Sequence, residues 1–194
     1  MAHMFYGVEK FNQHIADWDA SNVTNMAHMF EETSFNQPID RWDVSSVTDM
    51  NGMFAGNKAF NRPIGRWDVI NVTNMGGMFD GAIAFNQPLG NWDVSNVINM
   101  SIMFRNAKEF NRPIGDWNVS NVTNMPCMFG GCSNFNQDIS KWDVSKVTDM
   151  GEMFYKASSF SQNISHWNVK KVKDHNFIFK DCPIEEEYKP QFIQ

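Results

Sequence analysis

A single pattern of apolar and polar positions repeats along the chain. The segment FNRPIGRWDVINVTNMGGMF, residues 60–79, carries large apolar side chains at fixed places, and close copies of it precede and follow it. In this copy the apolar positions are Phe60, Ile64, Trp67, Val69, Val72, Met75, Met78 and Phe79. The period is marked by tryptophan, which recurs at Trp18, Trp42, Trp67, Trp92, Trp117, Trp142 and Trp167, first after 24 residues and then after every 25. This period predicts a repeat solenoid, in which a unit too small to bury its own core stacks on its neighbours.

Within each unit the pattern predicts a short strand, a second short extended piece and one helical turn. The alternation of polar and apolar residues in RWDV, residues 66–69, is typical of a half-buried strand with Trp67 and Val69 directed inward. VTNM, residues 72–75, predicts the second extended piece. From Met75 the apolar residues follow the i, i+3, i+4, i+7 spacing of one helical face. Stacking would place the short strands of successive units in parallel, around an interior that contains the tryptophans.

The repeat frame divides the chain into three parts. Residues 11–179 form seven stacked repeats of 24 or 25 residues, and residues 1–10 match only the second half of a unit. This partial N-terminal coil indicates either a longer array that has been cut or an open apolar end, and an open end favours self-association. Residues 180–194 leave the repeat frame. Because a terminal coil needs a polar outer face, this segment is predicted to be a C-terminal cap.

Two polar columns beside the tryptophans form the candidate partner-binding face. The residue before each tryptophan varies in charge while the frame around it stays constant: Asp17, Arg41, Arg66, Asn91, Asp116, Lys141 and His166. The residue after the tryptophan is mostly acidic and adds Asp43, Asp68, Asp93 and Asp143 to the face. A constant scaffold with variable exposed residues is how repeat proteins present a recognition surface. The alternative is a solvated strand face whose charges pair between neighbouring coils.

The acidic column has two interpretations of its own. Each carboxylate could accept hydrogen bonds from a nearby serine or backbone N–H, as in the sequence DVS, and close a local turn. A row of carboxylates could instead collect Ca²⁺ or another hard cation, which needs several oxygen ligands per ion. Asn118 and Asn168 interrupt the row, and this interruption favours the turn. No metal site and no cofactor site is therefore predicted.

Composition argues against several classes of partner. The formal net charge is −6 and lysine and arginine stand singly, so no basic stripe exists to bind the phosphates of a nucleic acid. No apolar run approaches the ~20 residues that span a bilayer, so membrane insertion is not expected. The three cysteines form neither a disulfide framework nor a CxxC metal pair. Nucleic acid and membrane are therefore not expected as partners.

The segment MFGGCSNFNQDISKWDVSKVTDMGEMF, residues 128–154, resembles the 25-residue repeat of BspA-like leucine-rich repeat surface proteins. Arrays of this repeat, described as a domain of unknown function, are abundant in mycoplasmas and other bacteria. The resemblance covers nearly the whole chain and implies a leucine-rich-repeat-like right-handed coil. It also implies a protein at the cell surface or secreted, with a role in adhesion or protein–protein contact, and it carries over no catalytic residue.

The sequence therefore favours a non-enzymatic scaffold for protein–protein interaction or adhesion, with a host or matrix protein as its partner. Two alternatives stay open. One is a self-assembling structural element joined through the open N-terminal coil. The other is a carbohydrate-active solenoid enzyme that uses Asp68 and Asp93. Against the enzyme, acid–base chemistry on sugars needs two carboxylates in different environments, and a column of equivalent aspartates does not supply them.

Overall fold

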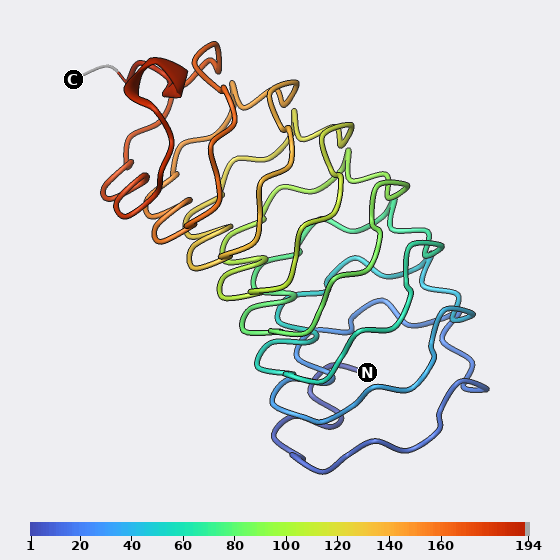
Figure 1. The fold of residues 1–194 in the computed structure, drawn as a ribbon. Helices are drawn as coiled ribbons and strands as arrows, with labels where there is room; N and C mark the ends of the chain where they lie inside the picture. The colour runs from blue at the N-terminus through green and yellow to red at the C-terminus, as the bar shows by residue number, and fades with distance from the viewer. Residues whose placement is uncertain (193–194) are drawn as a thin grey trace.

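The computed structural model describes residues 1–192 of the 194-residue chain. The chain winds into a row of similar coils, with the N-terminus at one end of the row and the C-terminus at the other (Figure 1). Residues one repeat apart are therefore neighbours in space. Phenylalanine, methionine, valine and tryptophan from the repeat frame fill the interior of the coils and form one continuous apolar core.

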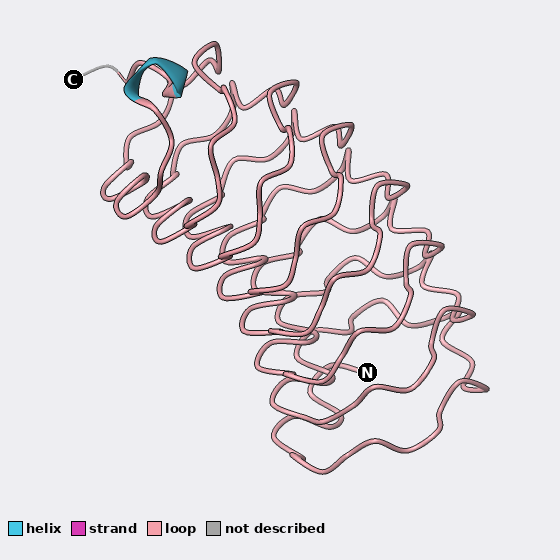
Figure 2. Ribbon diagram, viewed as in Figure 1, coloured by secondary structure: helices cyan, strands magenta, loops and turns pink. Residues whose placement is uncertain are grey.

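The expected fold class, a leucine-rich-repeat-like solenoid of short parallel strands, is wrong. Residues 1–192 contain no strand and no sheet, and almost the whole chain consists of turns and loops (Figure 2). The β-bridges between successive coils are parallel and isolated, and they join Asn25 to Asp49, Asp49 to Asn74, Asn74 to Asn99, Asn99 to Asn124, Asn124 to Asp149 and Asp149 to Asp174. A sheet requires backbone pairing over several consecutive residues, and these isolated bridges do not provide it.

Local turns explain why the RWDV segment, residues 66–69, forms no strand. Trp67 N donates to Ile64 O at 3.1 Å, so this N–H is used within its own coil. The carbonyl of Val69 likewise accepts from Val72 N at 2.9 Å. No backbone hydrogen bond joins this segment to the coils on either side. The alternating pattern therefore describes burial correctly without producing backbone pairing.

The expected helical turn is also absent. After Met75 only alternate N–H groups bond within the coil, as Met78 N does to Met75 O at 3.2 Å. The N–H groups between them donate to the next coil, as Phe79 N does to Met103 O at 2.9 Å. An α-helix would direct all of these groups along its own axis. The one helix within residues 1–192 is the 3₁₀ helix η1, Glu186–Tyr188, near the C-terminus.

Two positions of every coil have a left-handed backbone conformation, and together they replace the helical turn. The first column is His3, His28, Gly52, Gly77, Ile102, Cys127, Glu152 and Phe177, and the second is Gly7, Glu32, Gly56, Gly81, Asn106, Gly131, Lys156 and Asp181. Successive tight turns at these positions bring the apolar residues to the inside with helical spacing but without a helix. Ile102 is the least suited member, because a β-branched side chain at a φ of 63° is strained.

The strain at Ile102 leads to a testable prediction. At an ordinary position glycine is less favourable than alanine by about 0.5–1 kcal/mol. We expect the reverse here: Ile102→Gly should be more stable than Ile102→Ala by about 1 kcal/mol, because only glycine lacks the Cβ that disfavours a left-handed backbone. Urea unfolding of the two variants measures this difference, and both lose the same side chain beyond Cβ. An alanine variant at least as stable as the glycine variant would contradict the left-handed conformation.

Tryptophan and phenylalanine form columns in the core. The rings of Phe54 and Phe79 lie 5.7 Å apart between centroids, and those of Trp92 and Trp117 lie 6.4 Å apart. The indole N–H donates to a carbonyl of the preceding coil in Trp42, Trp67, Trp92, Trp117 and Trp142. These indoles are at most 4% exposed, whereas Trp18 is 38% exposed. The expectation that the tryptophans of successive repeats share an interior is confirmed.

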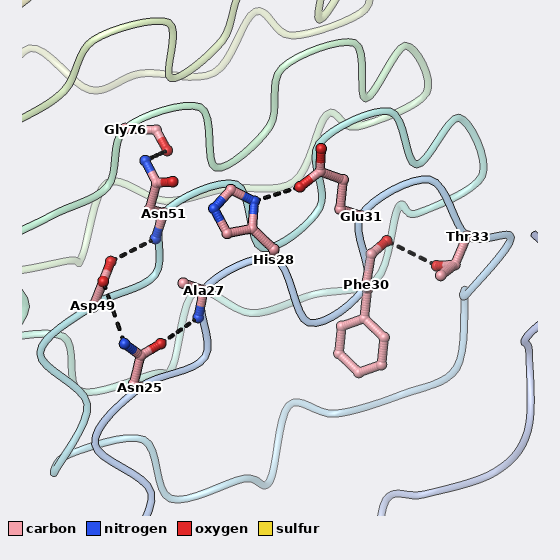
Figure 3. A network of polar contacts seen from close by, with 9 residues as sticks. All are labelled: Asn25, Ala27, His28, Phe30, Glu31, Thr33, Asp49, Asn51 and Gly76. Carbon is pink, nitrogen blue, oxygen red and sulfur yellow. Dashed lines mark hydrogen bonds and ion pairs between the residues drawn. The ribbon is translucent and has the colours of Figure 1, made fainter. Parts of the chain in front are cut away.

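A polar ladder accompanies the bridges between coils (Figure 3). Asn25 Oδ1 accepts from Ala27 N at 2.8 Å, and Asp49 Oδ1 accepts from Asn51 N at 3.0 Å in the next coil. Asn51 Nδ2 then donates to Gly76 O, one coil further, at 2.7 Å. These side chains both close the turn that follows each bridge and join successive coils.

The C-terminal segment crosses the end of the last coil (Figure 1). Of the predicted cap, residues 180–194, the last two lie outside the described part of the chain. Ile184 is buried against the core, and the ring of Phe192 stacks on His175 with centroids 4.3 Å apart.

Candidate interaction surface

Every residue of the predicted partner-binding face is exposed. The tryptophan at the centre of each segment from Trp42 onward is buried, so its two neighbours in the sequence point away from the core. The exposed residues of this face are Asp17, Arg41, Arg66, Asn91, Asp116, Lys141, His166, Asp43, Asp68, Asp93 and Asp143. Because the coils are in register, they form two adjacent columns, one before and one after the tryptophans.

Local turns hold the acidic column. Asp43 Oδ1 accepts from Ser45 N at 3.0 Å and from Ser45 Oγ at 2.6 Å. The same backbone contact with a serine two residues later recurs at Asp19, Asp93 and Asp143. Two hydrogen bonds lower the pKa of these four carboxyl groups: the one from the serine hydroxyl has the larger effect, and the one from the serine N–H has the smaller. The turn, one of the two interpretations from the sequence, is present, and residues 1–192 contain no group of three or more His, Cys, Asp or Glu arranged to hold a metal ion.

The variable column contains one ion pair between neighbouring coils. Lys141 Nζ lies 3.0 Å from Asp116 Oδ1, and the two side chains are 74% and 87% exposed. An ion pair this exposed contributes little to stability and leaves both charges accessible to solvent. Arg41 and Arg66 form no ion pair with any of residues 1–192. The face therefore presents unpaired positive charge on two successive coils.

A second variable surface was missed in the sequence. It consists of two residues from each coil: the one in the first left-handed column, such as Ile102, and the one three positions later, such as Arg105. Neighbouring repeats carry very different side chains at both positions. Here the Arg105 guanidinium binds Asp80 of the preceding coil through two contacts of 2.9 and 2.6 Å, and this hydrogen-bonded carboxylate raises the pKa of Arg105. A hollow of about 190 Å³ reaches Asp80, and another of about 290 Å³ reaches Arg105. The variation between repeats at these positions was the available signal, but the expected helical turn concealed that these positions of successive coils lie next to one another.

The coils and their exposed columns define the chain as a repeat protein. A family model described as "Mycoplasma protein of unknown function, DUF285" matches residues 1–104 and again residues 87–189, so the chain belongs to this family. The match confirms the resemblance to a mycoplasma repeat family and does not extend to BspA-like leucine-rich repeat proteins. No curated protein and no solved structure matches the chain. Within residues 1–192, no helix has the length and apolar character needed to cross a membrane.

Proposed function

We propose that this chain is a non-enzymatic scaffold that binds another protein through the partner-binding face, as the resemblance to BspA-like surface proteins implies. The observation that carries the proposal is the contrast between a constant buried frame and a variable exposed column beside it. Stacked coils hold these side chains in a pre-ordered array, so binding loses little conformational entropy. Arg41, Arg66 and Lys141 supply positive charge that complements acidic residues of a partner. The proposed partner is a host or matrix protein, met at the cell surface or after secretion.

The acidic column supports a non-catalytic role. Glycoside hydrolysis needs an acid and a base or nucleophile in different environments at a defined separation. Asp68 and Asp93 have similar environments, because both are exposed and each accepts a backbone hydrogen bond from the residue two positions later, at 3.2 and 3.0 Å. We therefore propose no enzymatic activity for this face.

Charge reversal tests the proposal. The triple variant with Arg41→Glu, Arg66→Glu and Lys141→Glu should lose binding to host or matrix proteins, while its melting temperature stays within a few degrees of wild type, because all three side chains are exposed. Surface plasmon resonance against a panel of purified matrix proteins measures binding, and calorimetry measures melting.

The matched control reverses three exposed charges in other columns, with Lys58→Glu, Lys108→Glu and Lys171→Glu. This variant has the same net charge as the first and should bind like the wild type. Unchanged binding by the first variant would remove this face from consideration, and equal loss in both variants would reveal a general charge effect.

A further inference from the structure

A slot opens in the second variable surface at one interior coil. The hollow of about 290 Å³ that reaches Arg105 lies over this coil, whose residues in the hollow are all small: Cys127, Gly130 and Gly131. The coils on either side carry larger side chains at the equivalent positions, which are Ile102, Arg105 and Asn106 before the slot and Glu152, Tyr155 and Lys156 after it. The slot is therefore the space of missing side chains between two coils that have them.

The core beneath the slot indicates how far apart its two walls are. The residue at the position of Arg105 and Tyr155 follows directly after a core phenylalanine in each coil. The ring of Phe129 stacks between those of Phe104 and Phe154, with centroids 5.8 and 5.7 Å apart. A group bound in the slot would lie one coil from Arg105 and one coil from Tyr155, as Phe129 lies between its two neighbours. The repeat spacing therefore suits a stacked ring.

Two planar groups form the walls of the slot. The guanidinium of Arg105 is fixed from the preceding coil by Asp80, at 2.9 and 2.6 Å, and is thereby held away from Gly130. The opposite wall is the half-buried ring of Tyr155, with Lys156 Nζ 4.8 Å from the ring centroid. A guanidinium stacks on aromatic faces, and a phenol ring pairs with other rings. Both walls therefore favour a flat aromatic group between them.

The slot has no net charge and few free hydrogen-bonding groups at its floor. Arg105 is paired with Asp80, and the exposed side chains of Lys156 and Glu152 have opposite charges. At the floor, Gly130 N donates within its own coil at 3.0 Å, and Gly130 O accepts from the preceding coil at 2.8 Å. Neither an anion nor a cation is selected by this arrangement, so the shape and the planar walls decide what binds.

We propose that this slot binds one uncharged aromatic side chain of a protein partner, between the guanidinium of Arg105 and the ring of Tyr155. The bound ring takes the place of the side chain that Gly130 lacks. The volume of about 290 Å³ lies at the lower end of the ~300–1,000 Å³ range of ligand pockets, which suits a single side chain. That the ring belongs to a protein rests on the proposed function, whereas the preference for an aromatic ring rests on the slot alone.

Amide NMR spectra of the isotope-labelled protein, titrated with capped amino acids, test the proposal. N-acetyltyrosinamide should cause saturable shifts of the Gly130 and Gly131 signals, and N-acetylleucinamide, which has no ring, should cause none. Tyr155→Ala should weaken the binding of N-acetyltyrosinamide by about two- to tenfold, the usual worth of an aromatic pair. Tyr155→Phe keeps the ring and should bind like the wild type. Equal binding by the alanine variant, or equal shifts with the leucine compound, would overturn the proposal.

A second pair of variants fills the slot and tests its position. Gly130→Tyr should abolish the shifts, because its own ring occupies the slot. The matched control Ala55→Tyr adds the same side chain at the equivalent position of another coil and should bind like the wild type. The dispersion of the spectra checks that each variant is folded, and the Tyr155 variants decide the outcome if Gly130→Tyr is not.

The identity of the ligand has its own controls. Free tyrosine that binds more tightly than N-acetyltyrosinamide would identify a site for an amino acid and overturn the assignment to a protein side chain. The triple charge-reversal variant of the partner-binding face should bind N-acetyltyrosinamide like the wild type, so failure of the slot and failure of that face are distinguished. A wild-type protein without saturable shifts would overturn the slot and leave the partner-binding face untouched.

Discussion

Trp92→Ala should lower the free energy of unfolding by about 3–5 kcal/mol, the usual loss for a large buried aromatic side chain. The indole is 3% exposed and stacks on Trp117, and its Nε1 donates to Ile64 O of the preceding coil at 3.1 Å. Alanine leaves a cavity, and the Ile64 carbonyl loses one of its two donors and keeps the other, Trp67 N. Because the stability of a repeat array is a sum of contacts between neighbours, one defective interior coil weakens the interfaces on both of its sides.

Trp18→Ala is the matched control, since the substitution is the same but the indole is 38% exposed. We expect it to cost less than half as much as Trp92→Ala. Urea unfolding followed by far-ultraviolet circular dichroism suits this comparison, because each variant loses a fluorophore. Equal losses for the two variants would mean that the interior tryptophans are not packed between coils.

Asn57→Asp should destabilise the protein by about 3–5 kcal/mol at pH 7, as expected when a buried charge lacks partners. Asn57 is fully buried, and its Nδ2 donates to Phe35 O at 3.0 Å and to Thr33 Oγ1 at 3.2 Å. Its Oδ1 accepts from Phe60 N at 3.0 Å. An ionised aspartate could still accept from Phe60 N but would direct its second, negatively charged oxygen at the carbonyl of Phe35.

The loss caused by Asn57→Asp should depend on pH. Burial raises the pKa of the introduced carboxyl in the folded state above its unfolded value of about 3.9. The electrostatic penalty is therefore complete above the folded pKa and disappears as the pH falls below the unfolded pKa. Asn57→Ala is the uncharged control, and alanine occupies the equivalent position at Ala82 and Ala107, so we expect a smaller loss without this pH dependence. Urea unfolding at several pH values compares the variants, and parallel pH profiles would contradict the prediction.

The side chains that share the core were determined by the sequence. Because the apolar frame recurs at a nearly constant interval, equivalent residues of successive units must lie against one another. Trp67 and Phe79 are buried as the pattern requires, and Arg66 and Asp68 are exposed because they flank a buried residue in an alternating segment. The exposure of the partner-binding face could therefore be predicted without a structure.

The backbone conformation was decided only by the tertiary structure. The strand and helix patterns around Trp67 and Phe79 report which side chains are buried, and they do not report where the N–H groups find acceptors. Alternate N–H groups donate to carbonyls of the next coil and not to carbonyls of their own coil. This pairing imposes a left-handed backbone on residues such as Ile102 and Glu152, against their intrinsic preference.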